Sequence, residues 1–191
     1  MKSLKNQVIW ITGASSGIGE ALACEMSAQG AKLILSSRRI DELERVKNNC
    51  AHSENVYVLP LDLTDSTNLE AKVPTAIAIF GHIDIMVHNG GISQRALVAE
   101  TEIAVHRQVM ELNYFSYIIL TKALLLHFIE RRSGYFVVTS SVMGKIGTPM
   151  RAAYAAAKHA LHGYFDCLRA EVDKYGVDAS VIQSFHLSCY F

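Results

Sequence analysis

The chain has no excess of charge of either sign and no long uninterrupted apolar run. Lysine plus arginine and aspartate plus glutamate each number 18 among 191 residues. A nucleic-acid-binding protein would carry a basic excess or a basic stripe, so we expect no nucleic-acid partner. The longest apolar stretch, residues 117–129, is interrupted by Lys122 and His127 and is too short to span a bilayer. Residues 1–7 are polar, so we expect a cytoplasmic protein without a leader peptide or a membrane span.

Cysteine is also scarce, and its spacing forms no metal-binding or redox motif. The chain has four widely separated cysteines, namely Cys24, Cys50, Cys167 and Cys189. They fit buried or incidental thiols in a reducing compartment better than disulfides or a zinc site. His159 and His162 have no cysteine or carboxylate at matching spacing. We therefore expect no metal and read these histidines as solvent-facing or helix-packing residues.

A short apolar run, residues 8–11, leads into a glycine-rich stretch and then into a helical pattern at residues 18–29. A continuous apolar run is typical of a parallel strand that is covered on both faces. Glycines in the following turn let the backbone approach a ligand, and the helix N-terminus behind them attracts a phosphate. This placement between a strand and a helix predicts a dinucleotide site. Its candidate residues are Gly13, Ser15, Ser16, Gly17, Ile18 and Gly19.

The end of the second expected strand, residues 31–36, indicates which dinucleotide binds. An NAD site usually carries an acidic residue at this point, whereas an NADP site carries a basic one. Here the strand is followed by Ser37, Arg38 and Arg39, and no carboxylate stands at its end. We therefore expect NADP(H) rather than NAD(H), with a solvated basic turn as the alternative interpretation.

Strand and helix patterns alternate along the whole chain. Further strands are expected at residues 55–59, 83–87, 134–139 and 177–182. Further helices are expected at residues 41–48, 66–78 with an interruption near Pro74, 102–113, 117–131 and 152–174. This alternation predicts an α/β fold, a Rossmann-type doubly wound parallel sheet with right-handed crossovers, as one domain over residues 1–191.

Ligands of such sheets bind beyond the carboxyl ends of the strands. Residues that follow the later strands should therefore gather at the same edge as the glycine-rich turn. The expected cofactor site is completed there by Asp62, Leu63, Asn89 and Gly90.

A tyrosine and a lysine four residues apart supply the chemistry. Tyr154 and Lys158 lie on one face of the last expected helix. The lysine ammonium favours the phenolate and lowers the pKa of the tyrosine, which can then act as an acid/base on an alcohol or a carbonyl. Alone, the pair also fits an ordinary helix-surface contact, so its assignment depends on the rest of the site.

Together these residues resemble the short-chain dehydrogenases/reductases, over about residues 6–182. Residues 12–19 resemble the family's cofactor motif, and Asp62 matches its acidic residue near the adenine ring. Residues 88–91 resemble its Asn-Asn-Ala-Gly segment with two substitutions, one of which places His88 next to the cofactor.

The catalytic set of the family is also matched. Asn113 matches the asparagine on the family's central helix, and Ser141 precedes Tyr154 by its usual interval of thirteen residues. The resemblance implies that Tyr154 exchanges a proton with the substrate oxygen, while Lys158 lowers its pKa and holds the nicotinamide ribose. It implies that Ser141 bonds the substrate oxygen and that Asn113 holds a water that links Lys158 to solvent.

The implied activity is that of an NADP(H)-dependent oxidoreductase that interconverts a carbonyl and a secondary alcohol on a small molecule. The resemblance also implies a homodimer or homotetramer formed through the helices at residues 117–129 and 155–168. The alternative is that both helices simply belong to the core.

The end of the chain departs from the family pattern. A Pro-Gly segment, a substrate loop and a seventh strand are expected after the sixth strand, but residues 184–191 continue differently and no proline or glycine follows Gly176. We therefore expect a C-terminally truncated product with six strands, an open sheet edge, weakened cofactor binding and poor turnover. The alternative function is a catalytically silent fragment that binds cofactor or pairs with a full-length subunit.

Overall fold

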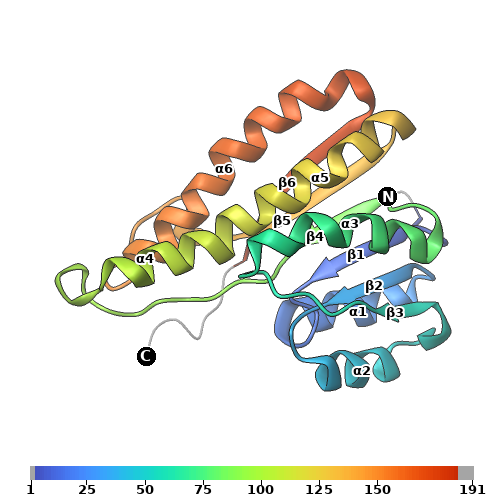
Figure 1. Cartoon of the computed structure of the whole chain (residues 1–191), viewed down its shortest axis with the longest axis horizontal. Helices are drawn as coiled ribbons and strands as arrows, with labels where there is room; N and C mark the ends of the chain where they lie inside the picture. Colours follow the sequence, from blue (N-terminus) through green and yellow to red (C-terminus); the bar gives the residue numbers. More distant parts are fainter. Residues whose placement is uncertain (1–2, 185–191) are drawn as a thin grey trace.

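The computed structural model describes residues 3–184, which contain a six-stranded sheet in the order β3-β2-β1-β4-β5-β6 (Figure 1). All five strand pairings are parallel, which confirms the predicted doubly wound sheet. The strands are β1 Val8–Thr12, β2 Lys32–Ser36, β3 Val56–Val58, β4 Ile85–His88, β5 Gly134–Ser141 and β6 Val177–Ser184. Of the C-terminal segment that was expected to depart from the family pattern, residues 185–191 lie outside the described residues.

Within residues 3–184, six α-helices connect and cover the strands. They are α1 Gly17–Ala28, α2 Ile40–Asn49, α3 Ser66–Phe80, α4 Ile103–Met110, α5 Ser116–Arg131 and α6 Ala152–Val172. Their bounds agree with the expected ones to within about a turn. The observed order of elements is therefore the predicted one.

Side chains of each strand alternate between two apolar layers. In β1, Val8 and Trp10 face the layer that contains α3, α5 and α6, whereas Ile9 and Ile11 face α1 and α2. Figure 1 shows α1 and α2 on one side of the sheet and the other helices on the opposite side. Burial on both faces explains why the first strand is a continuous apolar run rather than an alternating one.

The helix cover is incomplete over the last two strands. Within the described residues, β6 pairs only with β5 and forms one edge of the sheet. On the face that α1 and α2 cover elsewhere, Val137 of β5 is only half-buried and Ile182 of β6 is 54% exposed. The open edge expected at the sixth strand is therefore present in this part of the chain.

The expected interruption of the third helix at Pro74 is wrong. Helix α3 runs unbroken from Ser66 to Phe80 with Pro74 inside it. Proline lacks the N–H that would bond the carbonyl of Glu70. Pro74 lies on the exposed side of the helix, where water can bond the carbonyl that loses its partner. The helix therefore tolerates a residue that normally ends one.

The long helical region expected from the segments 102–113 and 117–131 is continuous. A π-helical turn, η3 Glu111–Phe115, joins α4 to α5 without a break. By length and hydropathy alone, the 29-residue helix Ile103–Arg131 meets the criteria for a membrane span, which the core helix of a soluble protein also does. One face of α5 is buried against the sheet through Tyr117, Leu120, Leu124 and Phe128.

Candidate active site

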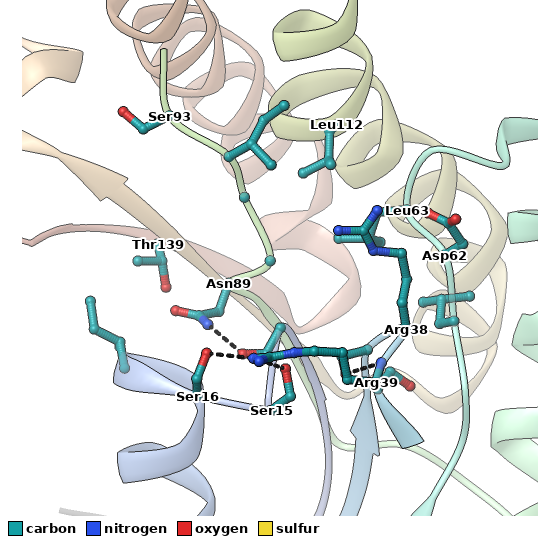
Figure 2. Close-up of a pocket in the computed structure, with 18 of the residues that line it drawn as sticks. Ser15, Ser16, Arg38, Arg39, Asp62, Leu63, Asn89, Ser93, Leu112 and Thr139 are labelled. Carbon is teal, nitrogen blue, oxygen red and sulfur yellow. Dashed lines mark hydrogen bonds between the residues drawn. The ribbon is translucent and has the colours of Figure 1, made fainter. Parts of the chain in front are cut away.

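A cavity of about 500 Å³ lies beyond the carboxyl ends of the strands (Figure 2). It is lined by the loops that follow β1 to β4, by the last residues of β5 and β6, by Leu112 of the central helix and by the first turns of α6. Most of the predicted cofactor residues line it, namely Gly13, Ser15, Ser16, Ile18, Ser37, Arg38, Arg39, Asp62, Leu63, Asn89, Gly90, Tyr154 and Lys158. The geometric prediction that strand-end residues gather at one edge of the sheet is therefore confirmed for the glycine-rich turn, Arg38, Asp62 and Asn89.

Two of the glycines are required by close backbone contacts. A Cβ atom on Gly13 would lie 2.5 Å from the Cα atom of Gly90, and one on Gly19 would lie 2.2 Å from the carbonyl oxygen of Gly13. Gly17 begins α1 with a φ of +60° and has open space around it. Gly17 and Gly19 therefore shape the turn without lining the cavity themselves.

Hydrogen bonds join the glycine-rich turn to the loop after β4. The backbone N–H of Asn89 donates to the Thr12 hydroxyl at 3.1 Å, and its side-chain amide donates to the Gly13 carbonyl at 3.3 Å. The Thr12 hydroxyl in turn donates to the carbonyl of Val87 at 3.2 Å. These bonds hold the two loops together at the floor of the cavity.

One end of the cavity is basic. The Arg39 guanidinium donates to the hydroxyl groups of Ser15 and Ser16, both at 3.1 Å. Figure 2 shows Arg39 extended toward these serines, while Arg38 reaches toward Leu63. Among the lining residues, Asp62 supplies the one carboxylate. This end can accept an anionic group that bonds arginine and hydroxyl donors.

The other end carries the predicted acid/base pair. Tyr154 is half-buried at the cavity wall, and the Lys158 ammonium nitrogen lies 5.7 Å from the centre of the Tyr154 ring. Lys158 is buried and donates to the carbonyl of Thr139 at 2.7 Å. Burial lowers the pKa of Lys158 to about 8, because a charge loses its hydration there. The lysine is thus held at one fixed position beside the tyrosine.

Ser141 and Asn113 do not line the cavity. The Ser141 hydroxyl accepts a hydrogen bond from the backbone N–H of Met143 at 3.3 Å, at the start of the short helix η4 Val142–Gly144. Asn113 is fully buried in the π-helical turn, and its amide bonds both the N–H and the carbonyl of Ile92, each at 2.8 Å. Asn113 therefore fixes the segment after β4, and Ile92 does line the cavity.

The sequence also indicated Gly91 and Ser93, which do line the cavity, but it missed other parts of the lining. The missed residues are Ser36, Leu61, Ile92, Leu112, Thr139, Ser140 and Ser184. Most of them directly adjoin predicted residues, so extending each strand-end motif by one or two positions would have found them. No local pattern predicted Ser184, because β6 runs two residues beyond its expected end at residue 182. Within this extension, the Ser184 hydroxyl donates a hydrogen bond to the carbonyl of Ser140 at 3.0 Å.

The expected position of the His88 side chain next to the cofactor is wrong. Met86 and His88 share the face of β4 that packs on α5 and α6, so the imidazole is completely buried in the core. It bonds the Thr121 hydroxyl at 2.8 Å and stacks on the Tyr117 ring at 4.8 Å. Burial lowers the pKa of His88 to about 3.

The two histidines that follow Lys158 have different environments. His159 is exposed and bonds the carbonyl of Ala155 in its own helix. His162 is buried and bonds the Ser140 hydroxyl at 3.2 Å. His162 therefore packs the helix against the end of β5.

The sheet order, the glycine-rich turn and the tyrosine–lysine pair in one cavity define a dinucleotide-binding protein of the Rossmann type. The family model described as short chain dehydrogenase matches residues 7–186, and the chain belongs to this family. Members of the family are oxidoreductases that bind NAD(H) or NADP(H).

Individual relatives agree with this assignment. The chain is 48% identical over 177 residues to "Dehydrogenase/reductase SDR family member 7" of Homo sapiens, covering 90% of this chain and 52% of the relative. It is 41% identical over 184 residues to "Dehydrogenase/reductase SDR family member 7B" of Mus musculus, covering 94% and 57%. The chain thus spans about half the length of the curated relatives it matches.

A solved structure shares the fold. A short-chain dehydrogenase from Streptomyces avermitilis superposes with a TM-score of 0.90 and 32% sequence identity. The similarity covers 95% of this chain and 67% of that one. The sheet and its flanking helices are therefore those of this family.

Proposed function

We propose that the chain is an NADP(H)-dependent oxidoreductase that interconverts a carbonyl and a secondary alcohol, with Tyr154 as the acid/base. The observation that carries the proposal is the pairing of two ends within one cavity. Lys158 bonds the end of β5 beside Tyr154, whereas Arg39 follows β2, and the strands β1 and β4 lie between these two in the sheet. NADP(H) carries its reactive nicotinamide ring and its ribose 2′-phosphate at opposite ends. The first would face the acid/base pair and the second would face the arginine.

The residues present fit such a cofactor. Because Gly13 has no side chain, its backbone packs directly on Gly90, and the turn that follows presents the N-terminus of α1, where a pyrophosphate is favoured. Arg38 and Arg39 would hold the ribose 2′-phosphate, and Asp62 would lie near the adenine. When bound, the nicotinamide supplies or accepts the hydride, while the protein provides position and electrostatics.

The remaining chemistry is a proton transfer by the chain itself. In reduction, the Tyr154 hydroxyl donates its proton to the carbonyl oxygen, and in oxidation the phenolate takes the proton of the alcohol. The nearby Lys158 ammonium favours the phenolate. Because the Ser141 oxygen already accepts from Met143, its hydroxyl hydrogen remains to be donated to the substrate oxygen.

We also propose that the active form is a homodimer or homotetramer built through α5 and α6, the helices that contain residues 117–129 and 155–168. Phe115 and Leu126 on the central helix are 47% and 68% exposed, which supports a partner on this surface. Light scattering on the purified chain tests the assembly, and a monomer at all concentrations would contradict it.

The function is tested by steady-state oxidation of NADPH with a panel of ketones and aldehydes. We expect turnover that is faster with NADPH than with NADH. Nucleotide binding without turnover across the panel would instead support the catalytically silent alternative, which no observation on residues 3–184 favours at present.

A further inference from the structure

Two cysteines that the proposed site does not use meet between the first two helices. Cys24 lies on α1, and Cys50 directly follows the last turn of α2. Cys50 belongs to the apolar layer under these helices, and Cys24 packs against the same layer. Both are free thiols.

A backbone hydrogen bond fixes how the two segments meet. Ser27 stands one turn beyond Cys24 on the same face of α1, and its hydroxyl accepts from the N–H of His52 at 3.0 Å. The turn that contains Cys50 is therefore held against the face of α1 that carries Cys24. Arg45 of α2 also pairs with Glu20 of α1 at 2.7 Å, so the two helices are joined at a second point.

The two thiols interact but differ in their access to solvent. Burial, and then the neighbouring Cys24 thiol, raise the pKa of Cys50 to about 11. Cys50 is only 7% exposed, whereas Cys24 is half-buried. A reagent from solution can therefore reach Cys24 first, with Cys50 in position to react second.

We propose that Cys24 and Cys50 form an oxidisable dithiol that a small-molecule disulfide, such as glutathione disulfide, converts into a disulfide between α1 and α2. The Cys24 thiolate attacks one sulfur of the reagent, forms a mixed disulfide and expels one glutathione thiolate. The Cys50 thiolate then attacks the Cys24 sulfur and expels the second. Two protein thiols are oxidised, and one glutathione disulfide is reduced to two glutathione molecules, which take up the two thiol protons.

The new bond would close a loop that contains residues 25–49. Closing a loop of this size restricts the unfolded chain, so the oxidised protein should unfold at a temperature several degrees higher. This inference does not depend on the proposed oxidoreductase activity, because neither cysteine lines the cavity.

The experiment is a peptide map of the native protein. The folded chain is incubated with glutathione disulfide at about pH 8.5, near the ordinary thiol pKa. It is then quenched with N-ethylmaleimide and digested with trypsin without reduction. We expect a linked pair of the tryptic peptides 6–32 and 48–72, which hold Cys24 and Cys50. The link should disappear on treatment with dithiothreitol.

The controls use the exposed thiol of Cys167. C24S and C50S should each lose the link, whereas C167S should keep it together with the rise in unfolding temperature. The proposal is overturned if Cys167 acquires glutathione while Cys24 and Cys50 stay unlinked, or if Cys24 retains glutathione without passing it to Cys50. A link that lowers the unfolding temperature would also overturn it. The wild-type map decides the question even if C50S does not fold.

Discussion

The indole N–H of Trp10 donates a 2.9 Å hydrogen bond to the hydroxyl of Ser36. Trp10 is completely buried and is the one tryptophan in the sequence, and Ser36 lines the cavity. A nucleotide that contacts Ser36 at the end of β2 therefore changes the surroundings of the indole, because the Ser36 hydroxyl is its hydrogen-bond partner. The intrinsic fluorescence of the protein is a built-in reporter for the first predictions.

Replacing Arg39 should weaken NADPH binding selectively. Hydrogen bonds to charged groups contribute about 1.5–3 kcal/mol, so we expect R39A to raise the dissociation constant for NADPH about 10- to 100-fold. The value for NADH, which lacks the 2′-phosphate, should change less than about twofold. The titration is read by Trp10 fluorescence, with K47A on α2, the helix that Arg39 precedes, as the control. Equal losses for both nucleotides would refute the assigned phosphate site.

Replacing Tyr154 with phenylalanine should remove the proton transfer and leave binding in place. General acid/base catalysis contributes about 10²- to 10⁴-fold, so the turnover rate of Y154F should fall by that factor. The affinity for NADPH should remain close to that of the wild type. Y57F is a suitable control, because Tyr57 is exposed on β3. Full activity of Y154F would rule out this tyrosine as the acid.

The buried imidazole of His88 should make the protein sensitive to acid. The pKa of His88 is about 3 in the fold and 6.5 in the unfolded chain, so only the unfolded state binds this proton between these values. The free energy of unfolding should therefore fall as the pH drops through this window, by up to about 1.4 kcal/mol per pH unit. Above pH 6.5 this contribution is fully present.

Urea unfolding at a series of pH values from 7 to 4 measures this contribution. H88F places a ring among the aromatic neighbours of His88 without a titrating group, so its stability should depend less on pH. H52Q, at an exposed histidine, should keep the wild-type dependence. If the free energy of unfolding depended on pH equally in H88F and the wild type, the lowered pKa of His88 in the fold would be refuted.

Two glycines offer a matched pair of substitutions. In G19A the new Cβ atom would lie 2.2 Å from the Gly13 carbonyl oxygen, so we expect a loss of nucleotide binding and of stability. In G163A the new atom meets nothing within 4 Å inside helix α6, and alanine favours the helix by about 1 kcal/mol. Thermal unfolding of both variants measures the contrast. A tolerated G19A would contradict the close packing of the glycine-rich turn.

Local patterns in the sequence predict most of the fold and the cofactor end of the site. Apolar runs bounded by turn residues locate the strands, and the order of elements then dictates that their carboxyl ends meet. The glycine spacing and the tyrosine–lysine interval are likewise short-range signals. Each of these features depends on residues close together in the chain, so a local pattern in the sequence is enough to predict it.

The features that were missed depend on partners far apart in the chain. Asn113 was predicted as a site residue, but its bonds to Ile92 were not, because no local pattern reports which backbone groups a buried amide will meet. The direction of the His88 side chain depends on where β4 starts and on the helices that cover it. Pro74 was expected to interrupt α3, because sequence alone does not show that its face is exposed to water.

The π-helical turn within the central helix has a consequence for length changes in this region. Each residue of an α-helix advances the chain by about 100°, so a wider turn sets α4 and α5 out of rotational phase. Val109 on α4 can thus face α6 while Tyr117 on α5 bonds Gly90 beside the cavity. Because the π turn already holds one residue more than an α turn, deleting one residue from Glu111–Phe115 would leave a regular helix with both faces in place, whereas inserting a further residue there would rotate one of these two faces outward by about 100°.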